Sequence, residues 1–316
     1  MSEHKTLSGY RIKYLSSDPP SPQEGELWYN SAALALKGGI RLEAWASGGN
    51  TNTALGTTAG CGSQTAGLVM GGADTVAKSE SYDGSSWTEG PDLNTGRYGA
   101  GEATAAPQTA AVIFGGVVTD TKKSEVEEYN GSSWSEVTDM PADIGQLAGA
   151  GTQTAAVSIS GGPSVAESYE YDGTNWTPAG NINTARERAA GFGTQTAAVA
   201  VGGGPPIVAN VEEYDGSSWT AVTAYPTAVR MAAAAGTLTA GLVFSGDVPP
   251  VTNATRAYDG TNWTTQPNMV TARSAGAGAG TQVSALMAAG SAANGTSLQT
   301  TEEYSSTVTT RSVDVS

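Results

Sequence analysis

The chain has 316 residues, of which 42 are glycine, with three phenylalanines, one cysteine and a net charge of −15. The acidic balance disfavours nucleic acid as a partner because phosphates need a basic surface, and one cysteine excludes an internal disulfide framework. The sequence has no apolar run of roughly eighteen residues and no apolar core of a signal peptide, so we expect folding in a cytoplasm and no membrane span.

Residues 1–39 differ from the rest of the chain. They contain the proline-rich stretch "DPPSP", which favours an extended link, and then "ELWYN" and "LALKG", which we expect to pair as two strands of a β-hairpin. The segment is too short to bury its large apolar side chains by itself. We therefore expect an anchor that docks onto another protein through Leu27, Trp28, Tyr29, Leu34 and Leu36.

The remainder of the chain is a repeat. Tryptophan recurs at intervals of 42 to 47 residues, at Trp45, Trp87, Trp134, Trp176, Trp219 and Trp263. Two further markers keep the same register: a turn such as "GTQTAA", and a glycine that ends each apolar run, as in "VMGG" or "IFGG". A period of this length is typical of repeats that each form one supersecondary unit.

Each repeat is expected to form four short strands: a Gly/Ala-rich strand such as residues 275–280, an alternating strand such as residues 155–160, a strand that ends in tyrosine, and the tryptophan strand. Asp-Gly or Asn-Gly joins the last two, as in "YDGSSW", and is a strong hairpin signal because glycine supplies the positive φ. Six repeats of four strands predict a six-bladed β-propeller in which the Gly/Ala strands crowd the axis.

The two ends of the repeat region complement each other. Residues 41–46 carry a tryptophan strand with no tyrosine strand before it, and residues 301–306 carry a tyrosine strand with no tryptophan strand after it. We expect these strands to pair in one blade, which closes the ring and removes open sheet edges. The predicted organisation is therefore an N-terminal anchor at 1–39, a propeller at 40–306 and a C-terminal tail at 307–316.

The order Gly-Gly, Tyr-Asp, Trp and then "NTGR" (residues 94–97) or "NTAR" (residues 183–186) resembles the kelch repeat over about residues 40–306. The resemblance implies an all-β, six-bladed kelch-like propeller. The chain departs from the usual pattern because it lacks a histidine before the inner strand and has compressed loops. A propeller fold carries little information about function.

A second resemblance concerns origin. "GELWYN" followed by "LKGG", with near-verbatim copies of "GTQTAA" and "YDGSSW", resembles structural proteins of tailed bacteriophages, particularly marine ones. It implies a virion protein, assembled in the host cytoplasm, that sits in a tail fibre, an appendage or the capsid surface. Residues 1–39 would then contact other virion proteins, with the chain as a homo-oligomer in the particle. An ordinary propeller cap is the alternative for this segment.

Four arginines open the Gly/Ala strand of four repeats, with Leu55 and Gln146 in the other two; these arginines are Arg97, Arg186, Arg230 and Arg273. Arginine suits bidentate contact with carboxylate or phosphate, and a ring would gather the four near one mouth of the axis. We therefore expect a site there for an acidic sugar or another anion. The alternative is that each arginine braces loops of the adjacent blade.

We expect no cofactor and no enzyme activity. Some kelch-type propellers are copper oxidases with a tyrosine–cysteine cross-link and histidine ligands, but this chain offers His4 and Cys61 alone, and Cys61 is expected to be a packed thiol. No carboxylate pair stands out for glycoside hydrolysis. We expect the recurring acidic residues to lie on solvated blade faces: Glu127, Glu128, Glu212, Glu213, Glu302 and Glu303.

The leading functional hypothesis is attachment to the host surface or to a glycan. The alternatives are a purely structural virion or decoration protein without a ligand, and a propeller glycosidase, which activity on bacterial polysaccharide would reveal.

Overall fold

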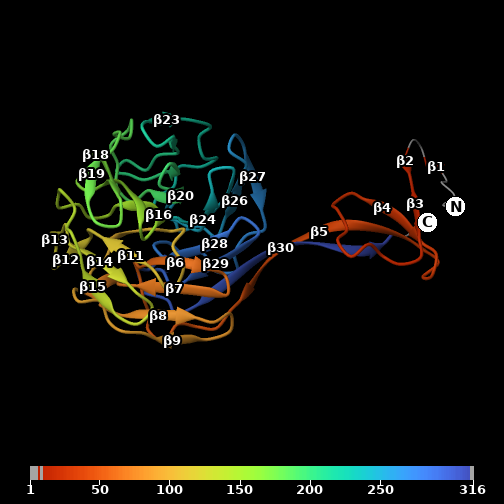
Figure 1. The fold of residues 1–316 in the computed structure, drawn as a ribbon, viewed down its shortest axis with the longest axis horizontal. Helices are drawn as coiled ribbons and strands as arrows, with labels where there is room; N and C mark the ends of the chain where they lie inside the picture. Colours follow the sequence, from red (N-terminus) through yellow and green to blue (C-terminus); the bar gives the residue numbers. More distant parts are fainter. Residues whose placement is uncertain (1–5, 8–9, 314–316) are drawn as a thin grey trace. The chain divides into compact units, whose positions relative to one another are not determined.

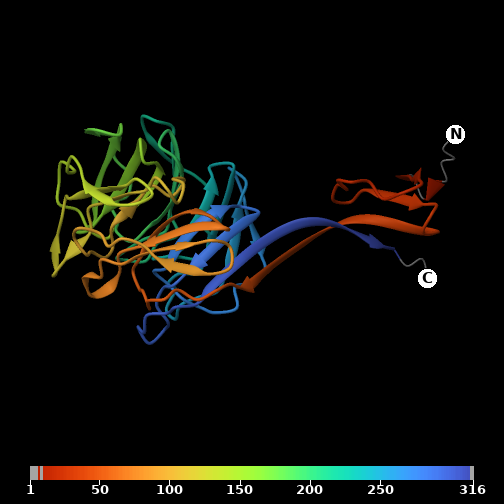
Figure 2. The same cartoon turned by 60° about the horizontal axis from the view of Figure 1, so that its bottom comes forward.

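The computed structural model describes residues 6–7 and 10–313 (Figures 1 and 2). It divides into two compact units, which we call the terminal unit (Met1–Ala44 with Ser305–Ser316) and the central unit (Trp45–Tyr304). Strand β5 (Ala35–Ser47) and strand β30 (Thr301–Ser312) each belong partly to both units.

The described residues of the central unit form six main sheets, numbered here in chain order, and the paired strands of sheets 1 to 5 are antiparallel. Sheet 1 contains β6 (Ala59–Ser63), β7 (Ala66–Met70), β8 (Ser79–Tyr82) and β9 (Trp87–Glu89). Sheet 2 contains β10 (Gly101–Glu102), β11 (Val112–Phe114), β14 (Val126–Tyr129) and β15 (Trp134–Glu136). Sheet 3 contains β16 (Ala148–Thr152), β17 (Ala155–Gly161), β18 (Val165–Tyr171) and β19 (Trp176–Pro178).

Sheet 4 contains β20 (Ala190–Thr194), β21 (Ala197–Val201), β22 (Val211–Tyr214) and β23 (Trp219–Ala221), and sheet 5 contains β24 (Ala233–Thr237), β25 (Ala240–Phe244), β26 (Thr255–Tyr258) and β27 (Trp263–Gln266). Sheet 6 contains β28 (Ala277–Thr281) and β29 (Ser284–Ala288), followed by β30 and β5. Two short elements lie in the loops of sheets 1 and 2: the 3-10 turn η1 (Ala73–Thr75), and the hairpin β12 (Val117–Val118) and β13 (Thr121–Lys122).

The Gly/Ala-rich strands lie at the centre of the central unit. They contact one another in cyclic order, β6, β10, β16, β20, β24, β28 and back to β6. In Figure 1 the labelled inner strands β6, β16, β20, β24 and β28 lie near the middle, and β9, β15, β19, β23 and β27 lie at the periphery. A Cβ atom added to Gly191 or Gly278 would stand 2.5 Å from a backbone oxygen of the preceding inner strand, so the close approach requires glycine. The fold is all-β and resembles a propeller.

The outer hairpins form as the repeated decapeptide predicts. Tyr82 pairs with Trp87 across the ladder, and their rings stack at 4.9 Å. In the turn between them the Asp83 carboxylate accepts hydrogen bonds from the Ser85 and Ser86 amides at 2.9 and 2.8 Å. These bonds hold the pKa of Asp83 down at about 2. The same Tyr–Trp stack recurs in sheets 2 to 5 at 4.5–5.0 Å.

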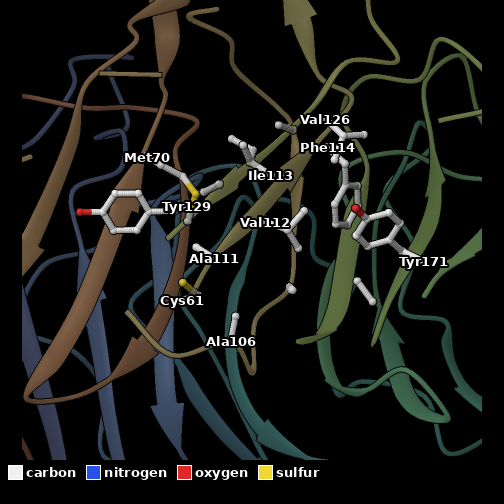
Figure 3. Close-up of a cluster of buried hydrophobic side chains, with 14 of the residues drawn as sticks. Cys61, Met70, Ala106, Ala111, Val112, Ile113, Phe114, Val126, Tyr129 and Tyr171 are labelled. Carbon is white, nitrogen blue, oxygen red and sulfur yellow. The ribbon is translucent and has the colours of Figure 1, made fainter. Parts of the chain in front are cut away.

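Large apolar side chains fill the spaces between the sheets. Phe114 of β11 packs edge-on against Trp176 of β19 at 5.1 Å, so a ring from sheet 2 lies against a ring from sheet 3. Figure 3 shows Phe114 beside Tyr171 in this cluster, and Cys61 on its other side, below Ala111. Cys61 is buried, and burial raises the pKa of its thiol, as expected of a packed cysteine.

The glutamine of each repeat's turn bridges two sheets. The Gln108 Nε2 donates to the carbonyl oxygens of Gly67 and Tyr82 in sheet 1, at 2.6 and 2.9 Å. Four other glutamines make the equivalent pair of bonds to the preceding sheet: Gln64, Gln153, Gln195 and Gln282. Leu238 occupies this position in sheet 5 and packs against an apolar cluster instead.

The strands at the two ends of the repeat region lie together in one sheet. The sheet order places β5 directly beside β30, and the Trp45 and Tyr304 rings are 5.4 Å apart. Trp45 is 8% exposed and its Nε1 donates to the Thr255 hydroxyl at 3.0 Å. The first and last strands of the repeat region therefore share sheet 6. Within the central unit, its outer strand is β5, from the start of the repeat region, whereas β28, β29 and β30 come from the end.

The terminal unit contains β3 (Lys13–Leu15), β4 (Leu27–Asn30) and the first part of β5, together with the short pair β1 (Thr6–Leu7) and β2 (Tyr10–Arg11). β4 pairs with β5 in an antiparallel ladder, as predicted, and with β3 in a parallel one. Trp28 is completely buried and its Nε1 donates to Asp18 at 2.9 Å. Hydrogen bonds from Asn30 and Trp28 hold the pKa of Asp18 below its usual value.

Two expectations for this unit need correction. Residues 1–39 do not have to bury their apolar side chains alone, because β30 continues into the same unit and the Val313 N–H bonds to the Leu36 carbonyl at 2.9 Å. The part of the expected C-terminal tail from 307 to 312 is therefore strand, and residues 314–316 lie outside the described residues. Leu34, by contrast, is 77% exposed.

Candidate functional site

Three of the four expected anion-binding arginines are buried. Arg97, Arg186 and Arg273 are at most 1% exposed, four residues before the first strand of sheets 2, 4 and 6. Each forms an ion pair with a glutamate in the third strand of its own sheet: Arg97 with Glu127 at 2.7 Å, Arg186 with Glu212 at 2.5 Å and Arg273 with Glu302 at 2.5 Å. The guanidinium groups are therefore buried against their own sheets and do not face solvent.

The motif "NTGR" wraps around one carboxylate. Glu127 accepts hydrogen bonds from the Asn94 and Thr95 amides at 2.7 and 3.1 Å. Arg97 completes the shell and also donates to the carbonyls of Gly115 and Glu125, at 3.1 and 2.6 Å. A buried guanidinium without such partners would be strongly unfavourable. The contacts support the bracing role, within the arginine's own sheet, rather than an external anion site.

Arg230 occupies a different register. In sheet 5 the buried position is held by Val229, which is 0% exposed, and in sheet 3 by Ile144, so neither Arg230 nor Gln146 is equivalent to Arg97. Arg230 is half-buried and pairs with Asp247 at 2.7 Å. The four arginines therefore do not converge on one site.

The expectation that the recurring glutamates are solvated is also wrong. Glu127, Glu212 and Glu302 are 0–2% exposed because they hold the buried arginines. In sheets 2, 3, 4 and 6 a glutamate directly precedes the tyrosine of the third strand, and it accepts a hydrogen bond from the tyrosine hydroxyl of the following sheet. The donor and acceptor pairs, at 2.5–2.9 Å, are Tyr171 to Glu128, Tyr214 to Glu170, Tyr258 to Glu213 and Tyr82 to Glu303. Burial and these bonds raise the pKa of each hydroxyl. These carboxylates join sheets.

A ring of backbone hydrogen bonds, which we call the mouth ring, lies just before the inner strands. It consists of six residues with φ between 52° and 60°: Thr57, Gly99, Gln146, Arg188, Met231 and Ala275. The N–H of each member after Thr57 donates to the carbonyl of the preceding member at 2.6–3.4 Å, and the N–H of Thr58, the residue after Thr57, closes the ring onto the Ala275 carbonyl at 3.3 Å. Gln146, which we expected near an arginine site, lies in this ring.

A cavity of about 90 Å³ lies among the inner strands and the mouth ring. Its walls are mainly glycine and alanine, and its two charged lining residues are Glu102 and Arg188. The other lining residues are Thr57, Thr58, Thr104, Gln146, Leu147 and Met231. Burial raises the pKa of Glu102 to about 8, opposed by a hydrogen bond from the Gly60 amide. An acid with this pKa keeps its proton at neutral pH when the cavity is empty.

Replacing Glu102 with glutamine is expected to change the pH dependence of stability. The folded pKa of about 8 lies above the ordinary 4.5, so the wild-type protein loses stability as pH rises between these values. At pH 9 the glutamine variant should be more stable by about 2 kcal/mol, after allowance for partial exposure, and melt about 5 °C higher. At pH 4 the two proteins should melt together. A gap that is the same at both pH values would contradict this assignment.

A second hollow, of about 470 Å³, which we call the rim groove, lies beside the mouth ring. Its lining residues are Thr57, Ala73, Asp74, Thr75, Tyr98, Thr119 and Asp120. Five of these have positive φ, namely Thr57, Asp74, Thr75, Thr119 and Asp120. Strained backbone of this kind gathers at ligand sites. The Tyr98 hydroxyl donates to Asp120 at 3.4 Å.

The rim groove could not be recognised from the repeat markers, because its residues belong to loops that vary between repeats. One signal existed: the interval from Trp87 to Trp134 is 47 residues, the longest in the series, and this repeat contains the additional β12–β13 hairpin.

Within the described part of the chain, no group of three or more His, Cys, Asp or Glu residues could hold a metal ion. Among the same residues, no helix is long and apolar enough to cross a membrane.

No protein-family model matches the chain, and no curated protein matches it. Among solved structures, the chain is similar to the structure of YjhT, with a TM-score of 0.68 and 13% sequence identity over 83% of this chain and 99% of that one. At this identity the similarity extends to the fold alone. It supports the propeller-like architecture of the repeat region.

Proposed function

We propose that the central unit is a six-bladed kelch-like propeller and that the protein is a virion component of a tailed bacteriophage that attaches to neutral glycans of the host surface. The cyclic contacts of six inner strands support the six blades, and the fold similarity to YjhT supports the propeller-like fold. The "NTGR" and "YDGSSW" repeats support the kelch type, and the "GELWYN" segment supports the phage origin.

The rim groove is the observation that carries the attachment role. Tyr98 offers an aromatic ring, on whose face a sugar can stack its C–H groups. Asp74 and Asp120 offer carboxylates, and three threonines offer hydroxyls, for the hydrogen bonds of sugar hydroxyl groups. The acidic lining and the net charge of −15 disfavour an acidic glycan. A neutral glycan therefore replaces the acidic sugar expected for the arginine set.

The terminal unit is the proposed attachment to other virion proteins, in a particle where the chain forms a homo-oligomer. Leu34, which is 77% exposed, is the side chain of the expected anchor best placed for such contact, with Leu27, Tyr29 and Leu36 half-buried. Trp28 stabilises the unit from inside. Electron microscopy of purified particles tests this role, and absence of the chain from the particles would overturn it.

Tyr98→Ala and Asp120→Asn are each expected to weaken binding to host cell-surface polysaccharide at least tenfold, because they remove the stacking surface and an acceptor of the rim groove. Surface plasmon resonance on immobilised polysaccharide measures this loss. Asp139→Asn, an exposed carboxylate outside the groove, is the matched control and should bind like wild type.

Unchanged binding of both groove variants would contradict the site. Release of reducing ends from the polysaccharide by the wild-type protein would instead identify a propeller glycosidase, and no binding of any host polysaccharide would leave the purely structural virion role as the correct one.

A further inference from the structure

The inner strand of sheet 2 differs from the other five inner strands at one position near the axis of the central unit. Alignment of the inner strands by their ladder partners places Glu102 opposite Ile113 in β11. The equivalent residues of the other sheets are Gly60, Gly149, Gly191, Ala234 and Gly278. Glu102 is thus a long acidic side chain where five of the six sheets have no side chain beyond a methyl group.

The turn that follows this strand adds a second polar group, the hydroxyl of Thr104. The turn after β10 is two residues longer than its counterparts, and it brings Thr104 to the wall of the axial cavity. The Thr104 hydroxyl oxygen is buried and has no hydrogen-bond partner among the described residues. A buried hydroxyl left in this state is unfavourable and is normally satisfied by water or a ligand.

The opposite charge lies at the mouth ring. Among the described residues that line the cavity, Arg188 is the one base and Glu102 the one acid. Arg188 stands 3.5 Å from Glu187, yet its Nε is buried and makes no hydrogen bond. Glu102 follows the ring member Gly99 by three residues, which places it roughly 10 Å deeper along the inner strand. The cavity therefore has a carboxylate at depth and a guanidinium at its entrance.

We propose that the axial cavity binds a small amino-acid-like zwitterion, with its ammonium group on the Glu102 carboxylate and its anionic group toward Arg188. A cavity of about 90 Å³ admits a molecule of a few heavy atoms and excludes a sugar ring with its substituents. The Thr104 hydroxyl supplies a further hydrogen bond to the ligand. This site adjoins the rim groove at Thr57, but the two use different charged side chains, so each can fail without the other.

Calorimetric titration of the full-length protein at pH 8 tests the proposal, with glycine, β-alanine and 4-aminobutyrate as probes. At least one of them should bind with a Kd below about 1 mM. Methylammonium and acetate, which carry one charge each, should bind at least tenfold more weakly than that probe. Absence of binding by all three amino acids at about 50 mM would overturn the proposal, and so would methylammonium binding as tightly as the zwitterion.

The chain itself supplies variants that should fold. Glu102→Gly introduces the residue that four other sheets carry, and Arg188→Met introduces the residue that sheet 5 carries at Met231, with the same backbone conformation. Each should weaken binding at least tenfold while thermal melting stays cooperative. Arg230→Met, at an arginine that does not line the cavity, is the matched control and should leave affinity unchanged. Wild-type affinity in Glu102→Gly would refute the site.

The affinity should also depend on pH. The ligand's ammonium group pairs with the ionised carboxylate, while burial keeps the pKa of Glu102 at about 8 and the neighbouring Cys61 thiol remains protonated. Affinity should therefore rise about tenfold from pH 6 to pH 7 and level off above pH 8. Binding at neutral pH should release protons, which calorimetry in buffers of different ionisation enthalpy detects. Flat affinity over this range would contradict pairing with Glu102.

Discussion

Replacing Glu127 with alanine is expected to lower the free energy of unfolding by about 3–5 kcal/mol, because it leaves the Arg97 guanidinium buried without a counter-charge. The same substitution also removes the acceptor of the Asn94 and Thr95 amides, so the loop loses its order. Urea unfolding followed by tryptophan fluorescence measures the change, with Asp139→Ala on the exposed surface as control.

A second substitution should restore the stability that Glu127→Ala loses. Sheet 3 has Ile144 and Tyr169 at the two positions that Arg97 and Glu127 occupy in sheet 2, and it forms the same four strands with two uncharged residues there. The double variant Arg97→Ile with Glu127→Tyr should recover most of the lost stability, since a buried pair can be exchanged for packed apolar groups at little cost. A double variant no more stable than Glu127→Ala would show that the ion pair stabilises sheet 2 in its own right.

Deletion of residues 1–47 is expected to cause aggregation and to lower the melting temperature by about 10 °C. The deletion removes β5 and exposes the edge of β30, which can then pair with other chains. It also removes Trp45, whose loss from its contacts with Phe244 and Tyr304 should cost about 3–5 kcal/mol. Size-exclusion chromatography with light scattering, together with thermal melting, measures both effects.

The matched control for the truncation is deletion of residues 1–34, which keeps the whole of β5. This shorter deletion should leave the central unit monodisperse with its melting temperature nearly unchanged. A soluble, well-folded protein that lacks residues 1–47 would contradict the closure of the central unit by β5.

The repeat architecture was predictable because its anchors are rare residues in a chain of small ones. Tyr82 and Trp87, with Asp-Gly between them, define a hairpin by local chemistry alone, and the turn glutamine recurs at five of the six joints between sheets. The unmatched strands at 41–46 and 301–306 indicated closure because a missing partner at one end had its complement at the other. These features depend on spacing, which the sequence displays directly.

The candidate site was not predictable to the same degree. Arg230 resembles Arg97 in the sequence, yet a shift of one residue moves it from the buried position to a half-buried one, because strand register cannot be read from an alanine-rich stretch. One internal signal pointed to the buried pairs. Sheets 3 and 5, which lack the arginine, also lack the glutamate and carry Tyr169 and Arg256 in its place. Sheet 1 departs from this correlation, because it has Leu55 in place of the arginine and keeps the buried Glu80, which binds the Asn52 and Thr53 amides.

The glutamine bridges make the joints between sheets chemically unequal. Leu238 replaces the glutamine where sheet 5 meets sheet 4, and it packs against the apolar cluster of Phe192, Val199 and Tyr258. Apolar contacts weaken on cooling, whereas amide hydrogen bonds do not depend on the hydrophobic effect. The joint between sheets 4 and 5 therefore lacks the pair of amide hydrogen bonds that the other five joints have, and we expect cooling to weaken it more than its neighbours.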